Sequence, residues 1–319
     1  MAILFDLNTP FAIYQPGDPV RRAMLNQMAF FFRFLKRMLS VTIERLARSS
    51  AFGRRSNNQS AKDERESGSI GPSARISVPS EHALDENTLI YAVGDIHGRA
   101  DLLSDLLGQI ERDATGFVGD VHIVFLGDYI DRGFQSRQVI DILLGERVKA
   151  FQAHFIKGNH EDAILSFISD PSFGPKWATY GGRETLVSYG IKPPKSMSLN
   201  EEWKKAHDDF LKACPRTHQT FLRTLPTRVK IGGYGFVHAG MKPGKDFAEQ
   251  EDHDLMWIRD EFLSSKSTFD VVVVHGHTPT DVPHHDHRRI NVDTGAYFTG
   301  RLTAVKLTSD VVEFLATGA

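Results

Sequence analysis

The stretch Val121–Gly133, VHIVFLGDYIDRG, predicts a buried strand that carries polar side chains at its carboxyl end. Its apolar run is too short for an ordinary helix, is rich in β-branched residues and stops at Gly127, which is typical of a strand buried on both faces. Ligands of open α/β sheets bind beyond the carboxyl ends of the strands, so Asp128, Asp131 and Arg132 are expected on the rim of a crevice. We interpret the stretch as the floor of a metal site. Asp and Gly are also ordinary turn residues, so the rest of the chain must decide.

The composition is that of an ordinary globular chain. Its 319 residues are 41% hydrophobic and 24% charged, which is enough for a full core. The 38 Lys and Arg nearly balance the 40 Asp and Glu, so no basic field points to nucleic acid as a partner. The single cysteine, Cys214, excludes an intrachain disulfide framework and a cysteine-rich zinc site, and fits the cytoplasm. We interpret Cys214 as a helix residue before Pro215, not as a nucleophile.

Residues 1–48 differ from the remainder, because residues 23–48 predict an amphipathic helix with a basic side and an apolar side. Charges interrupt the helix before the roughly 20 apolar residues that a membrane span needs, and the small-residue cleavage signal of a secretory peptide is lacking. Two interpretations stay open for residues 23–48. The helix lies on an anionic surface, which would place a cytoplasmic protein peripherally at the inner membrane, or it packs on the folded domain or another protomer.

Residues 49–87 are poor in large apolar side chains and rich in Ser, Gly and charge. Such a composition cannot offset the entropy of ordering the chain, so it predicts a flexible linker. The folded domain is expected over residues 88–319, a length that one domain can have.

Within the predicted domain, strands alternate with helices and then strands dominate. The first half predicts strands at 89–93, 121–126 and 151–157, and helices at 101–113, 136–149 and 161–168. Residues 170–226 predict an irregular and then helical insertion. The second half predicts strands at 234–237, 271–274, 289–292, 303–307 and 311–315. This order fits an α/β fold in which two mixed sheets pack face to face with helices outside, a four-layer α/β/β/α sandwich.

Acidic, amide and imidazole side chains recur where the predicted strands end. The motifs are GDIHG with Asp95 and His97, GDYIDRG with Asp128 and Asp131, GNHE with Asn159 and His160, HAG with His238, and HGHT with His277. Residues two apart on an extended chain point to the same side, so Asp95 and His97 can bind one ion. Oxygen and imidazole ligands without thiolate favour Mn²⁺, Fe or Zn²⁺. A second ion would need a bridging carboxylate, for which Asp128 is central, and two cations roughly 3.5–4 Å apart suit an in-line displacement.

The motifs GDIHG, GDYIDRG, GNHE, HAG and GHTP, in this order and with these gaps, resemble the calcineurin-like metallophosphoesterases. Within them, the chain is most similar to the serine/threonine phosphoprotein phosphatases (PPP type) in their compact bacterial and bacteriophage form. The resemblance covers Thr88 to about Leu307. It implies two divalent metal ions, with Mn²⁺ expected first and Fe or Zn²⁺ as alternatives. It implies Asp95, His97 and Asp128 as ligands of the first metal, and Asp128, Asn159, His238 and His277 as ligands of the second.

The resemblance also implies hydrolysis without a phosphoenzyme, by direct attack of a metal-bridging water or hydroxide on phosphorus. Arg132, Arg259 of the LMWIRD segment and Asn159 would bind the substrate phosphate. His160 would be the general acid that protonates the leaving group, and Asp131 would orient it and hold its proton.

We therefore expect a metal-dependent phosphomonoester hydrolase acting on a phosphoprotein or a phosphorylated small molecule. The main interpretation is a serine/threonine protein phosphatase. One alternative is a diadenosine tetraphosphate or other dinucleoside polyphosphate hydrolase, a sister family, against which the intact DRG with Asp131 and Arg132 argues. Another is a membrane-associated regulatory adaptor with a vestigial site, against which the complete ligand set argues. A fold carries a site but does not choose its substrate.

Three further features are interpreted conservatively. The tract His284–Arg289, HHDHRR, is expected to be a solvated loop. His275 is expected beside the metal ligands, where it would orient a ligand or a water molecule. Trp177 and Tyr180 are expected to pack in the core, with a place on the substrate rim as the alternative.

Overall fold

The structure is a computed structural model that describes residues 76–77 and 84–318. The helix predicted for residues 23–48, with its proposed membrane or protomer contact, lies outside the described residues, as does most of the predicted linker. The described part of the chain contains no helix that is both long and apolar enough to cross a bilayer.

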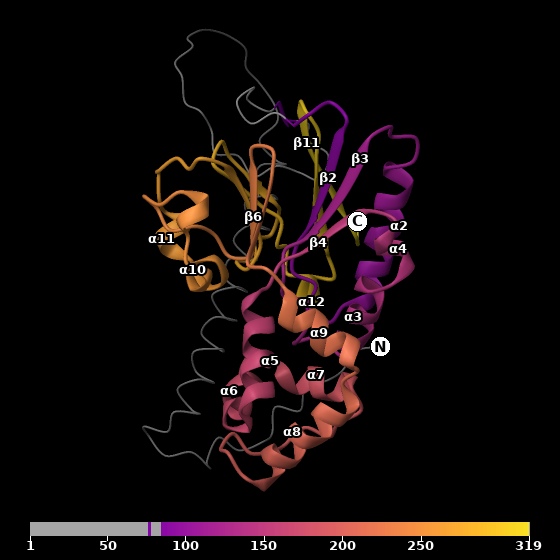
Figure 1. Cartoon of the computed structure of the whole chain (residues 1–319), viewed down its shortest axis with the longest axis vertical. Coiled ribbons are helices and arrows are strands. Elements are labelled where there is room, and N and C mark those ends of the chain that lie inside the picture. Colours follow the sequence, from indigo (N-terminus) through magenta and orange to yellow (C-terminus); the bar gives the residue numbers. More distant parts are fainter. Residues whose placement is uncertain (1–75, 78–83, 319) are drawn as a thin grey trace, which may run out of the picture. The chain divides into compact units, whose positions relative to one another are not determined.

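Two mixed sheets form the centre of the fold (Figure 1). The first has the strand order β1-β11-β10-β2-β3-β4, in which β2, β3 and β4 are parallel and β1, β10 and β11 pair antiparallel. Its strands are β1 (Ile76–Ser77), β2 (Thr88–Val93), β3 (Asp120–Phe125), β4 (Gln152–Phe155), β10 (Thr303–Leu307) and β11 (Val311–Ala316). The second has the order β5-β6-β7-β9-β8, with β6, β7 and β9 parallel. Its strands are β5 (Arg228–Ile231), β6 (Tyr234–Val237), β7 (Val272–His275), β8 (His284–His285) and β9 (Arg289–Asn291).

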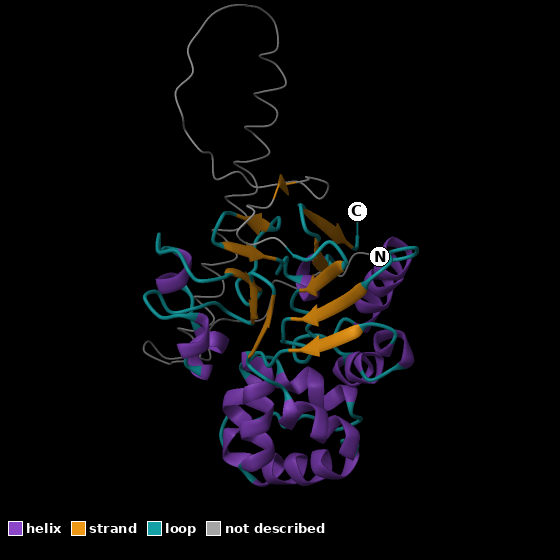
Figure 2. Cartoon of the chain, turned by 45° about the horizontal axis from the view of Figure 1, so that its top comes forward, coloured by secondary structure: helices purple, strands orange, loops and turns teal. Residues whose placement is uncertain are grey.

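Helices flank both sheets. Beside the first sheet lie α2 (Ala100–Asp113), α3 (Ser136–Leu143) and α4 (Glu146–Lys149). Beside the second lie α10 (Asp252–Trp257) and α11 (Asp260–Leu263), and α12 (Ala296–Thr299) precedes β10. The helices of the predicted insertion gather at one end of the sheets (Figures 1 and 2). They are α6 (Gly174–Ala178), α7 (Gly182–Ser188), α8 (Glu201–Ala213) and α9 (Arg216–Thr224), and they lie beside α5 (Asn159–Ser169), the helix predicted at 161–168. Short 3₁₀ turns occur at Pro171–Phe173 and, beyond the insertion, at Phe247–Glu249.

The alternation of side chains along the strands explains the layers. In β3 and just beyond it, Ile123 and Phe125 pack with the helices α2 and α3, whereas Val124 and Leu126 pack between the two sheets. In β7, Val273 packs on the opposite side, in a third cluster with α10 and α11. Full burial of each such side chain contributes roughly 1.5–3 kcal/mol. Three apolar clusters thus separate four layers, and the predicted α/β/β/α sandwich is confirmed.

Three local features differ from the sequence expectation. The helix expected over residues 136–149 is divided into α3 and α4, with Gly145 in an extended conformation between them. The edge strand β5 was not expected, because its side chains are only partly buried and alternate weakly. Ile76–Ser77 pairs with β11, and Leu84 is buried between the sheets, although both fall within residues 49–87.

The expected solvated loop His284–Arg289 is corrected by the structure. His284 and His285 form β8, which pairs antiparallel with β9. The carboxylate of Asp286 accepts the backbone N–H groups of Arg288 and Arg289, whose side chains are only 11% and 12% exposed. Most side chains of the tract are therefore partly buried around the hydrogen-bonded turn at Asp286, although the polar composition of the tract predicts exposure to solvent.

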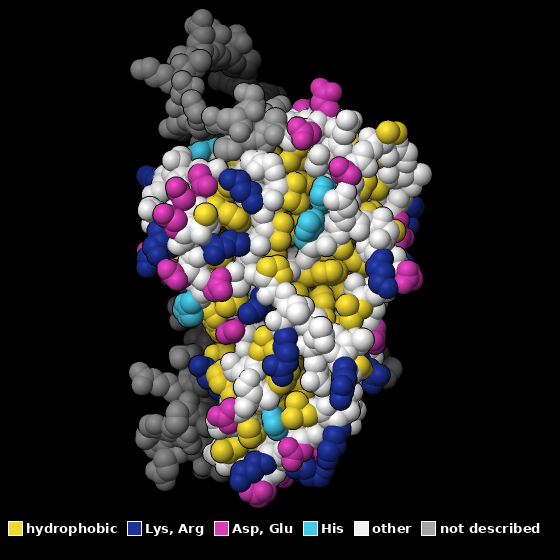
Figure 3. Space-filling model, in the orientation of Figure 1, with side chains coloured by type: hydrophobic (Ala, Val, Ile, Leu, Met, Phe, Trp, Pro, Cys, Tyr) yellow, Lys and Arg dark blue, Asp and Glu magenta, His cyan; other side chains and the backbone are white. Residues whose placement is uncertain are grey.

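The charged side chains do not form a field of one sign on the face shown in Figure 3, where Lys and Arg are interspersed with Asp and Glu. This agrees with the formal net charge of −2 for the whole chain.

Candidate metal centre

The loops that follow the strands of both sheets bring the predicted ligands together. Asp95 and His97 follow β2, Asp128 follows β3, Asn159 begins α5 after β4, and His238 and His277 follow β6 and β7. All six side chains are buried. Because the two sheets face each other, ligands from both halves of the chain reach one place, as the motif order predicts.

Asp128 lies between two sets of ligand atoms. One carboxylate oxygen is 3.5 Å from Nε2 of His97, and the other is 3.4 Å from Nε2 of His238. Two groups of buried side chains with metal-ligand spacing share this residue: His97, Asp128 and His160, and Asp128, His238 and His277. A carboxylate common to two groups is what a dinuclear centre requires of a bridging ligand.

The imidazoles of His97 and His238 are oriented as metal ligands. Nδ1 of His97 donates to the carbonyl of Ile130, and Nδ1 of His238 donates to the carbonyl of Leu126, both at 2.9 Å. With one ring proton held at Nδ1, Nε2 faces Asp128 and can hold either a second proton or a metal ion. A backbone carbonyl that fixes the tautomer in this way is a usual partner of a metal-bound histidine.

The second group of ligands also fits a cation. Oδ1 of Asn159 is 2.9 Å from Nε2 of His238 and 2.9 Å from Nδ1 of His277, and the buried Nε2 of His277 has no hydrogen-bond partner among the described residues. Burial alone would lower the pKa of His238, but the Asp128 carboxylate outweighs it and raises the pKa to about 10. The cluster therefore stabilises a positive charge at this place, and the residues present fit a divalent metal.

Asp95 lies at the edge of the centre, farther from the other ligand atoms than Asp128. Its carboxylate accepts the backbone N–H of His277 at 3.1 Å and is 4.0 Å from Nε2 of His97. Gly276 is required here, because a Cβ at that position would lie 2.1 Å from the carboxylate. Burial, and then the nearby carboxylate of Asp293, raise the pKa of Asp95 well above its usual range. Asp293 belongs to the DTG segment after β9, and the sequence did not single it out as a site residue, because Asp close to Gly is a common turn signal.

His160 and Asp131, the predicted acid and its partner, are in contact. Nδ1 of His160 is 2.7 Å from Oδ2 of Asp131. Asp131 also accepts Nε1–H of Trp177 at 2.9 Å and the hydroxyl of Thr185 at 2.7 Å. Trp177 is fully buried, as expected, but it also positions Asp131. Nothing in the sequence signals Thr185. Nε2 of His160 is 3.7 Å from Asp128, so the structure groups His160 with the ligands more closely than the motifs suggest.

The two predicted phosphate-binding arginines differ in position. A guanidinium nitrogen of Arg132 is 3.2 Å from Nε2 of His160, so Arg132 lies in the centre. Arg259 is exposed at the start of α11, and its side chain has no hydrogen-bond partner among the residues that the structure describes. Burial, His238 and the positive charge of Arg259, in that order, lower the pKa of His277. Arg259 is therefore within electrostatic reach of the ligands without contacting them.

Backbone strain is concentrated at the centre. The non-glycine residues with positive φ in the described chain are His97, Asp128, Asp131, Arg132 and His277. Left-handed conformations of such residues persist only where the surroundings impose them, and they cluster at functional sites.

Glu161 holds the loop of Asp128 in this strained conformation. Its carboxylate accepts the backbone N–H groups of Asp128 at 2.8 Å, Tyr129 at 2.9 Å and Gly158 at 3.0 Å. From the sequence, Glu161 is predicted only as the first residue of a helix, although it is the last residue of the GNHE motif.

His275 contacts the backbone next to a predicted ligand. Its Nδ1 donates to the carbonyl of Gly276 at 3.0 Å, and its Nε2 accepts a guanidinium N–H of Arg289 at 3.2 Å. It makes no hydrogen bond to the side chain of a predicted ligand within the described ranges. The ring thus supports the backbone before His277 instead of orienting a ligand.

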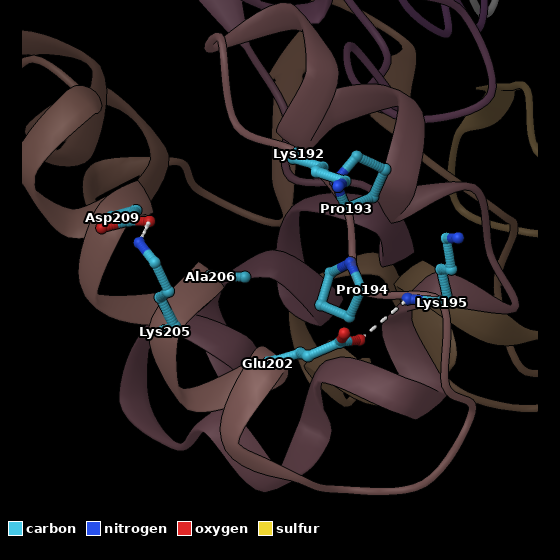
Figure 4. Close-up of a pocket in the computed structure, with 8 residues that line it drawn as sticks. All are labelled: Lys192, Pro193, Pro194, Lys195, Glu202, Lys205, Ala206 and Asp209. Atoms are coloured by element: carbon cyan, nitrogen blue, oxygen red, sulfur yellow. Dashed lines mark hydrogen bonds and ion pairs between the residues drawn. The ribbon is translucent and has the colours of Figure 1, made fainter.

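A separate pocket lies on the helical insertion, between α8 and the segment before it (Figure 4). Three of its charged groups already have partners: Lys205 pairs with Asp209 at 2.5 Å, and the carboxylate of Glu202 accepts the backbone N–H of Lys195 at 3.2 Å. The pocket contains none of the predicted site residues.

Comparison with known proteins gives three informative similarities. The chain is 28% identical over 243 residues to the asymmetrical bis(5'-nucleosyl)-tetraphosphatase PrpE of Anoxybacillus flavithermus, covering 68% of this chain and 90% of that protein. It is 40% identical over 80 residues to the serine/threonine-protein phosphatase PP1-1 of Saccharomyces cerevisiae, covering 25% of this chain and 24% of that protein. The crystal structure of a candidate diadenosine tetraphosphatase matches 74% of this chain and 97% of its own, with 20% identity and a TM-score of 0.51, which shows a shared fold.

The family described as Calcineurin-like phosphoesterase matches residues 88–310. This range begins with β2, includes every motif at the centre and ends in the turn before β11. The paired His and Asp groups around Asp128 are those of a dinuclear metal site. On this evidence the chain belongs to the calcineurin-like phosphoesterases and is a metal-dependent phosphoesterase.

Proposed function

We propose that this protein hydrolyses dinucleoside polyphosphates such as diadenosine tetraphosphate. The observation that carries the proposal is the similarity to PrpE, which extends over 90% of that protein, whereas the similarity to PP1-1 is limited to 24% of its length. The order of the two sequence interpretations is thereby reversed. The intact DRG does not decide between the two activities, because Asp131 and Arg132 contact His160 and would have the same roles in either one. Protein phosphatase remains the second candidate, on the 40% identity over 80 residues.

The proposed metal ligands are the six residues predicted from the motifs. Asp95, His97 and Asp128 would hold one divalent ion, and Asp128, Asn159, His238 and His277 the other. Mn²⁺ is the first choice for both, with Fe or Zn²⁺ as alternatives, since the donors are carboxylate, amide and imidazole groups without thiolate. Bound divalent ions supply Lewis acidity: they lower the pKa of water and withdraw charge from phosphoryl oxygens.

Arg132 would bind the phosphate next to the bond that is cleaved. Among the described residues, its guanidinium contacts Nε2 of His160 and the face of Tyr297 but no carboxylate, so a phosphate oxygen is a stronger partner for it. Arg259, exposed and close enough to influence His277, would bind a second phosphate. A tetraphosphate chain carries enough negatively charged phosphates to bind both arginines.

Once a bound phosphate draws the Arg132 guanidinium away from Nε2 of His160, this nitrogen would hold a proton and donate it to the leaving oxygen. Asp131 keeps the other ring nitrogen protonated, and Trp177 and Thr185 keep Asp131 in place. A polyphosphate leaving group is a weak base and needs little protonation, whereas the alkoxide of serine needs much. His160 would therefore matter less for a dinucleoside polyphosphate than for a phosphoserine peptide.

The test compares three substrates on full-length protein that is stripped with chelator and reloaded with Mn²⁺: diadenosine tetraphosphate, a phosphoserine peptide and para-nitrophenyl phosphate. We expect kcat/KM for diadenosine tetraphosphate to exceed that for the peptide by about tenfold or more, a difference of about 1.4 kcal/mol in transition-state binding. Cleavage should give ATP and AMP, the asymmetrical products. A higher kcat/KM for the peptide would reject the proposal in favour of the protein phosphatase.

A further inference from the structure

A row of seven rings crosses the candidate metal centre. The distances between consecutive ring centroids are 4.9 Å from Phe298 to Tyr297, 5.5 Å to His97, 4.6 Å to His160, 6.1 Å to Tyr180, 6.0 Å to Trp257 and 6.3 Å to His253. The two middle rings, His97 and His160, are buried beside Asp128. The outer rings form two arms that reach the surface from different parts of the fold.

The first arm consists of Tyr297 and Phe298 on α12, which are 38% and 54% exposed. The guanidinium of Arg132 lies 4.9 Å from the centroid of Tyr297, so the arm begins at the proposed phosphate site. Gly295 allows Phe298 to lie over the backbone, because a Cβ there would come within 2.2 Å of the ring. The carbonyl of Ala296 accepts a hydrogen bond from the Arg99 guanidinium at 3.0 Å, and this bond holds α12 against the loop after β2. Two large rings are thus held in place without being buried.

The second arm consists of Tyr180, Trp257 and His253. Tyr180 follows α6 and contacts the ring of His160, and Trp257 ends α10 on the layer beside the second sheet. His253 stacks on Trp257 with 18° between the rings, and its side chain is 80% exposed. In the view of Figure 1, α10 lies on one side of the start of α5 and α12 on the other. The two arms therefore flank the centre.

We propose that the two arms bind the two bases of a dinucleoside polyphosphate, one on each side of the metal centre, while the polyphosphate chain crosses between them. This inference rests on the proposed function and adds where the bases bind. Every nucleobase has a π-face that can stack on aromatic side chains, whichever base it is. Such a molecule has a base at both ends and negative charge between them. The row has exposed rings at both ends and the phosphate-binding Arg132 between them.

The central experiment measures KM and kcat of Phe298→Ala and Trp257→Leu. Phe298 ends the first arm, and leucine at 257 keeps an apolar side chain where Trp257 is half-buried. Each variant should raise KM for diadenosine tetraphosphate roughly 5- to 150-fold, the equivalent of roughly 1–3 kcal/mol for one stacked base. Neither should change the kinetics of glycerol 2-phosphate, which has no ring that could stack on either arm.

Phe134→Ala is the matched control. Phe134 is 64% exposed and follows the Arg132 turn, but its ring has no ring contact with the row in the described chain. It should leave KM for diadenosine tetraphosphate unchanged. If Phe298→Ala and Trp257→Leu also leave it unchanged while the wild type cleaves the dinucleotide, the inference is overturned and the proposed function stands. If they raise KM only for a phosphoserine peptide, the row binds peptide and the inference is equally overturned.

A second measurement does not depend on cleavage of the dinucleotide. AMP and ribose 5-phosphate differ only by the base, so the ratio of their inhibition constants against para-nitrophenyl phosphate isolates base binding. We expect AMP to bind about tenfold or more tightly in the wild type, and Phe298→Ala or Trp257→Leu to reduce that ratio toward one. If this holds in a protein that does not cleave diadenosine tetraphosphate, the proposed function fails and base binding by the row remains. An equal ratio in wild type and both variants would remove the inference.

Discussion

Nδ1 of His160 lies 2.7 Å from Oδ2 of Asp131, and both side chains are buried, although Asp131 lies in the loop after β3 and His160 in the first turn of α5. This pair leads to the first prediction. His160→Asn should lower turnover of a phosphoserine peptide by roughly 10²–10⁴, the usual contribution of general acid catalysis. The loss should be much smaller for para-nitrophenyl phosphate and for diadenosine tetraphosphate, whose leaving groups need little protonation. Metal content measured in parallel should stay near two per chain. An equal loss on all three substrates would assign His160 to positioning or ligation.

The second prediction concerns Asp128, which faces both ligand groups. Asp128→Asn should weaken binding of both ions and abolish activity, because one residue loses its charge in two coordination shells. Elemental analysis after dialysis would measure the metals. Asp105→Asn, an exposed carboxylate on α2, is the control and should retain both ions. A variant at 128 with two metals and wild-type turnover would refute the bridging assignment.

The third prediction concerns Glu161, which accepts three backbone N–H groups around the strained loop of Asp128. Glu161→Gln replaces an acceptor oxygen with an amide donor, so a buried N–H loses its partner at a cost of about 1–3 kcal/mol. Thermal unfolding should show a lower Tm, and metal affinity should fall because φ of Asp128 is no longer imposed. Asp162→Asn, one residue further along α5, should change neither. If Glu161→Gln binds metal with wild-type affinity, metal binding does not depend on the loop conformation that Glu161 imposes, and the prediction is wrong.

The fourth prediction concerns where the domain begins. A protein of residues 76–319 should unfold at a higher urea concentration than one of residues 88–319, because only the longer one keeps buried Leu84 and the backbone hydrogen bond from Asp120 to Asn87. Burial of a leucine alone contributes roughly 1.5–3 kcal/mol. Equal midpoints would favour the boundary at residue 88 that composition suggests.

The sequence by itself determined the four layers and the place of the centre. The apolar alternation in strands such as β3 is local, so it shows which side chains face a helix and which face the other sheet. Polar residues at the carboxyl ends of neighbouring parallel strands lie close together, which is why Asp95 after β2 and Asp128 after β3 could be assigned to one site before any contact was known. The short motifs also identified the family, because their order reflects the order of the strands.

Only the tertiary structure decided how that centre is supported. Trp177 and Thr185 reach Asp131 across 46 and 54 residues because the helical insertion packs beside the sheet ends, and no local pattern encodes that distance. The row that links Phe298 to Trp257 joins five segments, whose meeting depends on how the layers stack: α12, the loop after β2, the start of α5, the loop before α7, and α10. Side-chain periodicity reports on one element at a time. Contacts between elements depend on the packing of the whole domain, and they appear only when it is folded.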